Sequence, residues 1–210
     1  MSGSGRGGEG ALGGDGPARG WPRLELLRSA LAGAAAVAGA ALFGRADIVL
    51  AADSQEQDVR VLNLVLRLEY TEAAFYTEAI RNARLGGDLL KYAQAVERHE
   101  QEHVQFLRQA LGTDAVASPG FSFGNATRDP DAFTRAAIEL EDLAVAGYNG
   151  QATNLSPATL AAAATIVSVE ARHAAWIRAI TGRVAAPEPV DKPVTAAELE
   201  RRLRQIGMRS

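Results

Sequence analysis

The sequence contains no cysteine, which excludes both disulfide bonds and thiolate metal ligands and leaves the compartment unconstrained by redox arguments. The formal net charge is only −3 in 210 residues, which gives no reason to expect a nucleic-acid partner. Aromatic residues make up 6% of the chain. No stretch alternates apolar and polar residues for long enough to predict a strand. What remains is an alanine-rich chain with room for one domain and tails, typical of closely packed helices.

The first 53 residues are predicted to lie outside the folded domain. Residues 1–20 are rich in glycine and serine and are expected to be disordered. Two arginines then precede an apolar run at residues 30–43, and Ala51 offers a small residue at a cleavage point. This order is typical of a signal peptide, and the run is short for a membrane span. We therefore expect export or membrane anchoring, with an ordinary amphipathic helix in a cytoplasmic protein as the alternative.

Apolar residues at helical spacing predict an all-α fold, a four-helix bundle in residues 54–182. The helices are expected to run from Ser54 to Arg84, from a cap at Asp88 to Leu111, from Pro130 onward, and from Pro157 to Gly182. Residues 112–129 form a long connection between two short ones, which is the topology of a bundle with one crossover. Residues 183–210 are predicted to form a linker and a short C-terminal helix after a capping box at Thr195.

Two Glu-x-x-His motifs, Glu100 to His103 and Glu170 to His173, are the most informative pattern in the chain. Residues three apart in a helix are neighbours on one face, with Cβ atoms about 5–6 Å apart, so a carboxylate and an imidazole can bind one metal ion together. One such motif is weak evidence, because surface helices are rich in glutamate. Two motifs, each preceded by a glutamate on another helix, match the ligand pattern of di-iron and di-manganese carboxylate bundles.

The two upstream glutamates, Glu69 and Glu141, belong to an internal duplication. Each is followed at the same interval by a tyrosine, Tyr76 or Tyr148. The interval from each glutamate to the next Glu-x-x-His motif is also nearly equal in the two halves. Matching residues at matching offsets predict a bundle with approximate two-fold symmetry and a site on the axis.

The helical neighbours of each glutamate help to select the ligands. Glu141 has apolar neighbours on its face, whereas Glu139 borders polar residues and is expected to face water. On the first helix, both Glu69 and Glu72 border apolar positions. The duplication selects Glu69, because Ala144 stands where Glu72 would repeat. Glu72 is expected to be either an additional ligand or a residue that contacts the ligands.

Charge balance favours two metal ions. The expected ligands are Glu69, Glu100, His103, Glu141, Glu170 and His173. Taken singly, each acidic residue would more often be a solvated group on an amphipathic helix. Taken together, four buried carboxylates are prohibitively costly without compensation, and two divalent cations balance them with both histidines neutral. Carboxylate and imidazole ligands suit two iron ions first, with manganese as the alternative.

A rival motif overlaps the first pair, since His99, Glu100 and His103 form a literal His-Glu-x-x-His. In zinc peptidases this motif places two zinc-binding histidines on one helical turn, with the glutamate as base. A third protein ligand would still be needed. This interpretation leaves Glu69, Glu141 and the second Glu-x-x-His motif unexplained. His99 is therefore expected to contact the ligands or to lie at the surface.

The two tyrosines of the duplication have two interpretations. Tyr76 and Tyr148 each lie two helical turns from an expected ligand on the same face. Each is either a core aromatic with a satisfied hydroxyl or a hydrogen-bond donor to a metal-bound carboxylate.

At these residues the sequence resembles the ferritin-like superfamily, and more narrowly the bacterial and plant ferritin-like proteins that include desiccation-related proteins. The segments that carry the resemblance are residues 68–76, 99–104, 140–142 and 169–175. The resemblance implies a four-helix bundle with a di-metal site at the six expected ligands. Members of this group often carry export signals, which agrees with the N-terminal segment.

Two functions are consistent with this reading of the residues. In the first, a di-iron or di-manganese centre reacts with oxygen or peroxide, or oxidises Fe(II), in stress protection. In the second, the bundle is a non-enzymatic stress-protective or envelope-associated structural module, and the metals contribute mainly to stability. The expected partners are metal ions and oxygen or peroxide, with membrane contact through the N-terminal segment. The sequence names no organic substrate and leaves oligomeric state and iron storage open.

Overall fold

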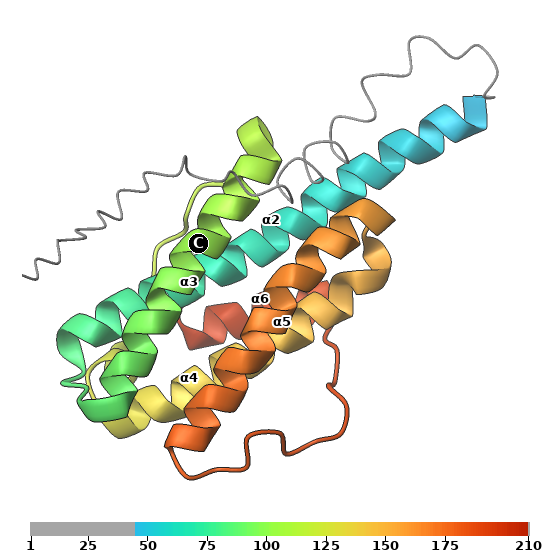
Figure 1. Ribbon diagram of the computed structural model, residues 1–210. Helices are drawn as coiled ribbons and strands as arrows, with labels where there is room; N and C mark the ends of the chain where they lie inside the picture. Colours follow the sequence, from blue (N-terminus) through green and yellow to red (C-terminus); the bar gives the residue numbers. More distant parts are fainter. Residues whose placement is uncertain (1–44, 210) are drawn as a thin grey trace, which may run out of the picture.

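The computed structural model describes residues 45–209, with side chains from Ser54 onward, as a bundle of long helices (Figure 1). The helices are α2 (Arg45–Asn82), α3 (Gly87–Leu111), α4 (Pro130–Gln151), α5 (Pro157–Ile180) and the shorter α6 (Ala196–Ile206). Within this part of the chain the only β-type pairing is an isolated bridge between Phe121 and Met208. The expected all-α bundle is confirmed.

The helices pair in the order that the connections require. Helix α2 packs most extensively against α3, and α4 against α5, across the two short connections. Residues 112–129 form the long connection between α3 and α4 and contain two short 3-10 turns. Figure 1 shows this segment running back along the bundle, so the two hairpins lie side by side. This arrangement brings one face of each long helix to a common interior.

Two helices, α4 and α6, begin at residues whose side chains cap them. Asp129 accepts a hydrogen bond from the backbone N–H of Ala132, with Pro130 at the first helical position, and Thr195 accepts one from Glu198 N–H. The expected cap at Asp88 is wrong. The cap is Gly86, without a side-chain hydrogen bond, and Gly87 follows at φ +56°. The chain therefore enters α3 before Asp88, which lies in the first turn and pairs with Lys91.

The first long helix differs from expectation at its start, because α2 begins at Arg45 rather than Ser54. The expected cleavage point at Ala51 thus lies within the helical span of α2. The apolar run at residues 30–43, on which the export prediction rests, lies outside the described residues. Within the described part of the chain, no helix is both long and apolar enough to cross a membrane.

One helix cap is supplied from another helix. Ser156 begins α5 without a hydrogen bond from its own side chain to the helix backbone. Instead, the buried carboxylate of Asp58 on α2 accepts from Ser156 N–H at 2.8 Å and from the hydroxyls of Ser156 and Thr159, both at 2.6 Å. A carboxylate at a helix N-terminus satisfies free backbone donors and opposes the helix dipole. This contact fixes α5 against α2.

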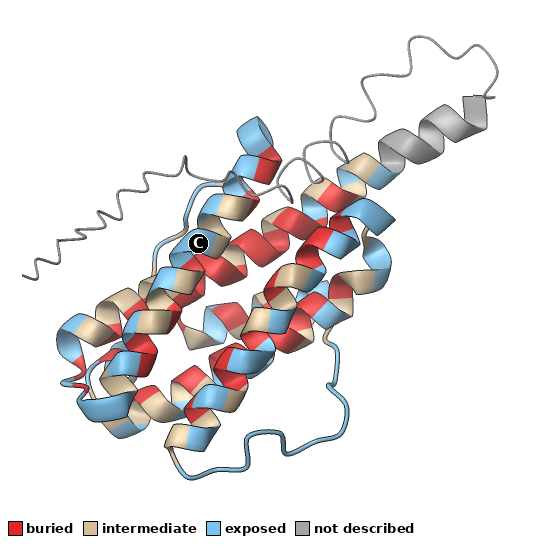
Figure 2. Cartoon of the chain, viewed as in Figure 1, coloured by how far each residue is buried: buried red, intermediate tan, exposed pale blue. Residues whose placement is uncertain are grey.

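The C-terminal segment completes the core rather than standing apart from it. Leu199 and Leu203 of α6 are fully buried against the bundle, and Figure 2 shows the buried faces of all the helices meeting inside it. Val194 donates a backbone hydrogen bond to the carbonyl of Ala146 at 3.1 Å. The Val194 carbonyl would lie 1.8 Å from a Cβ at Gly150, so only glycine permits this approach to α4.

Candidate metal centre

Four helices each contribute a fully buried glutamate to the middle of the bundle. Glu69 comes from α2, Glu100 from α3, Glu141 from α4 and Glu170 from α5, and each has zero exposure. They are buried because each lies on the apolar stripe of its helix; Val65 and Leu66, for example, lie one turn before Glu69, and Ala137 and Ala144 lie one turn on either side of Glu141, and all four are buried.

The first donor group forms around His103. Its Nδ1 atom lies 3.2 Å from Oε2 of Glu69, 3.0 Å from Oε2 of Glu100 and 3.0 Å from Oε1 of Glu170. Donor atoms of these four residues all lie within 4.8 Å of one another. Four nitrogen and oxygen donors at this spacing can hold one metal ion.

The second donor group forms around His173. Its Nδ1 atom lies 3.1 Å from Oε1 of Glu100, 3.3 Å from Oε2 of Glu141 and 3.3 Å from Oε2 of Glu170. These four residues again bring donor atoms within 4.8 Å of one another. Glu100 and Glu170 thus give one oxygen to each imidazole, while Glu69 and Glu141 each belong to one group. The structure brings all six expected ligands together, with two carboxylates shared.

Three of the donor oxygens also fit metal binding because they lack hydrogen-bond partners. Oε1 of Glu100, Oε2 of Glu141 and Oε1 of Glu170 are buried without a hydrogen-bond partner. Each faces an imidazole nitrogen at 3.0–3.3 Å, but not in hydrogen-bonding geometry. A buried oxygen without a partner is destabilising. A cation in each group would satisfy these oxygens, so the residues fit two metal ions.

In the metal-free protein the imidazoles compensate the carboxylates. Burial opposes protonation of His103, but the nearby carboxylates of Glu100, Glu170 and Glu69 outweigh it and raise its pKa well above the ordinary value. Burial likewise opposes protonation of His173, yet the surrounding carboxylates raise its pKa to about 12. Both rings are therefore protonated at neutral pH, whereas metal binding requires a neutral Nδ1.

The two tyrosines of the duplication cross between the halves. Tyr76 on α2 donates a short hydrogen bond to Oε1 of Glu141 on α4, and Tyr148 on α4 donates to Oε1 of Glu69 on α2 at 2.5 Å. Each bond leaves the other oxygen of its carboxylate directed at a histidine. The hydroxyls therefore orient the two unshared carboxylates, each from the opposite half of the bundle.

Tyr92 is a contact of the site that the sequence did not reveal. Its hydroxyl lies 2.9 Å from the hydroxyl of Tyr76 and 3.4 Å from Oε1 of Glu141. The corresponding position in the second half is Ala162, so the duplication gives no signal for Tyr92. The only available signal was an aromatic hydroxyl on the inner face of α3.

His99 contacts a ligand rather than joining either donor group. Its Nδ1 atom lies 2.8 Å from Nε2 of His173, and the two rings stack with centroids 5.1 Å apart. Burial and the neighbouring His173 lower the pKa of His99. His99 thus orients the His173 ring. The zinc-peptidase motif requires His99 and His103 to bind the same ion, but His99 is not in the donor group of His103.

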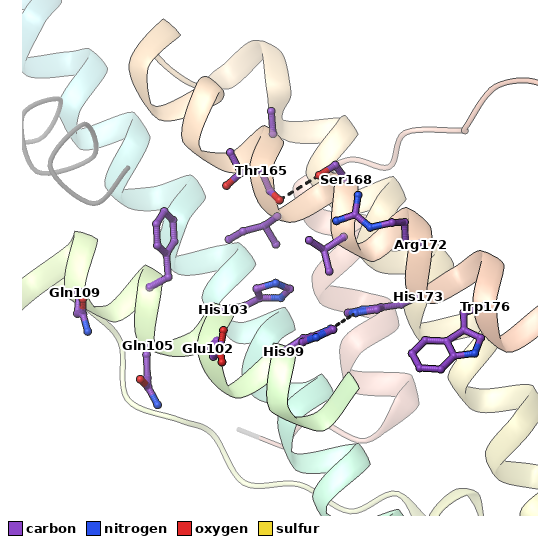
Figure 3. Close-up of a pocket in the computed structure, with 14 residues that line it drawn as sticks. His99, Glu102, His103, Gln105, Gln109, Thr165, Ser168, Arg172, His173 and Trp176 are labelled. Carbon is purple, nitrogen blue, oxygen red and sulfur yellow. Dashed lines mark hydrogen bonds between the residues drawn. The ribbon is translucent and has the colours of Figure 1, made fainter. Parts of the chain in front are cut away.

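A surface pocket leads to the outer side of the imidazoles. The pocket has a volume of about 760 Å³ and lies between α3 and α5, with His99, His103 and His173 at its floor (Figure 3). Arg172 and Trp176 line its α5 side. The ligand carboxylates lie behind the imidazoles and are not exposed to it.

Comparison with known proteins agrees with the fold. A family model described as the ferritin-like domain matches residues 57–183, which is more than half of the chain. No curated protein matches the chain. The chain belongs to the ferritin-like domain family, and it carries a buried glutamate and histidine cluster that could hold metal.

Metal binding is expected to release protons. Because His103 and His173 are protonated without metal, each must lose a proton before its Nδ1 can become a ligand, so apparent affinity should rise as pH rises. Anaerobic calorimetric titration with Mn(II) at pH 7 in buffers of different ionisation enthalpy measures this release. A binding enthalpy that is independent of the buffer would contradict it.

Proposed function

We propose that the bundle holds two transition-metal ions, iron first and manganese as the alternative, and uses them to react with oxygen or peroxide. The observation that carries this proposal is the division of Glu100 and Glu170 between two histidine-centred donor groups. Shared carboxylates hold two ions close enough to act on one small molecule. A single structural ion would need only one of the groups.

The chain's own residues support redox chemistry because they orient the ligands and exclude water from the ligand carboxylates. Fe(II) in these positions would supply the electrons that reduce oxygen or peroxide and would itself become Fe(III). Tyr76 and Tyr148 hold Glu141 and Glu69, and His99 holds His173. All four ligand carboxylates have zero exposure, so their donor strength is not weakened by solvent.

The pocket between α3 and α5 gives small molecules a route toward this centre. It reaches the rings of His103 and His173 from outside, whereas the carboxylates remain buried. Oxygen, peroxide and Fe(II) are all small compared with its volume of about 760 Å³.

The test is oxidation of Fe(II) followed by stopped-flow absorbance after mixing the Fe(II)-loaded protein with oxygen. Native protein should oxidise iron much faster than free Fe(II), and His103→Ala and His173→Ala should fall to the rate of free iron. Glu139→Gln is a matched control for Glu141→Gln, because Glu139 is exposed on the same helix two positions away.

Native rates no faster than free iron would reject the redox proposal. In that case the non-enzymatic alternative, a stress-protective or envelope-associated module with metals that stabilise the fold, would be supported. The Glu141→Gln variant then tests the stabilising role. A stabilising metal should raise the melting temperature of native protein but not that of Glu141→Gln.

We propose further that the N-terminal segment exports the protein or anchors it facing outward. Support comes from the basic, apolar and small residues in that order within residues 1–53. Mass measurement of protein from the native host is expected to show removal near Ala51, or an intact terminus in the membrane fraction. An intact terminus in the cytoplasmic fraction would reject both forms of the proposal.

A further inference from the structure

Glu72 is a buried carboxylate that the six-ligand centre does not use. In the described part of the chain, the buried side-chain atoms without a hydrogen bond are Glu72 Oε1 and Oε2, Glu100 Oε1, Glu141 Oε2 and Glu170 Oε1. The last three belong to the ligands of the proposed centre. Like those three oxygens, both oxygens of Glu72 are buried without a hydrogen-bond partner, so they are also free to bind a cation.

Glu72 lies beside the centre and not at a distant point of the core. It follows Glu69 by one helical turn on α2 and has zero exposure. Burial raises its pKa, and the repulsion of Glu100, then Glu170, adds to this effect. The shared carboxylates are therefore its strongest charged neighbours. A buried carboxylate with neither a hydrogen bond nor a cation is costly, and a nearby metal ion removes that cost.

The second half of the bundle carries no such carboxylate. Ala144 is fully buried at the position of α4 that corresponds to Glu72 on α2. The six expected ligands are divided equally between the halves, whereas Glu72 belongs to one half only. An additional donor at this position would make the two ion positions chemically unequal.

We infer that Glu72 is a seventh protein ligand, which binds one of the two metal ions and gives the centre two unequal positions. This inference rests on the proposed di-metal function. Glu72 is outside both four-donor groups, so its side chain must turn toward the ion. The absence of hydrogen bonds to its carboxylate leaves it free to do so.

The experiment is an anaerobic titration of metal-free protein with Co(II), followed by calorimetry and visible absorption. Native protein is expected to bind two Co(II) per chain with different affinities. Glu72→Ala, which copies Ala144, and Glu72→Gln, which keeps the side-chain shape, should each weaken one step by about tenfold or more and leave the other unchanged. The d–d absorption per bound Co(II) should change at the weakened position only.

Controls separate a ligand from a structural residue. Glu78→Gln removes a carboxylate of the same helix that accepts a hydrogen bond from Thr127 outside the centre, and it should bind Co(II) as the native protein does. Metal-free Glu72→Gln should melt no lower than native protein, because it replaces a buried carboxyl group that makes no hydrogen bond, while its stabilisation by Co(II) should shrink. A merely structural role would lower the metal-free melting temperature and leave the absorption unchanged.

The outcomes distinguish this inference from the function on which it rests. Two Co(II) bound by Glu72→Gln with native affinities and native absorption would overturn the seventh ligand and leave the di-metal proposal standing. Native protein that binds no Co(II) would overturn both.

Discussion

The structure depends on compensation of the negative charge that it buries. Five glutamates with zero exposure lie in the middle of the bundle: Glu69, Glu72, Glu100, Glu141 and Glu170. Ionised carboxylates in such a place are tolerated only with cations or hydrogen bonds around them. In the metal-free protein, protonated His103 and His173 supply two positive charges. A metal ion in each donor group would supply more positive charge and would satisfy oxygens that the imidazoles leave without hydrogen bonds.

The rest of the bundle keeps these charges in fixed positions. Tyr76 and Tyr148 cross between the halves, so each hairpin orients a carboxylate of the other. Asp58 fixes the start of α5 against α2, and α6 covers α4 with Leu199 and Leu203. A site that carries six ligand residues from four helices requires this rigidity, because a small shift of one helix would separate a shared carboxylate from one of its two partners.

Much of the arrangement could be predicted because ligand positions follow from helical periodicity. The spacing of Glu100 and His103 places both on one face, and the duplication then indicates Glu69 and Glu141 on the partner helices. The all-α bundle followed from apolar residues at helical spacing, and its single crossover followed from connection lengths. These features are local or repeated, so the sequence alone contains them.

Contacts between distant segments could not be predicted in the same way. Nothing near Tyr92 indicates that it will meet Glu141, and nothing near Asp58 indicates that it will cap α5. The pairing of Tyr76 with Glu141 rather than Glu69 depends on how closely the hairpins approach. The start of α3 depends on a left-handed glycine at Gly87, which moves Asp88 from the cap into the first turn.

The most direct measurement is the iron content of purified protein after anaerobic loading with Fe(II) and removal of free metal. Two donor groups that share Glu100 and Glu170 predict two iron ions per native chain. Glu100→Ala and Glu170→Ala should each lose both ions or hold them weakly, because each removes a donor from both groups, whereas Glu139→Gln should retain two. Native protein that retains no iron would contradict the account, and full iron content in both alanine variants would contradict the shared carboxylates.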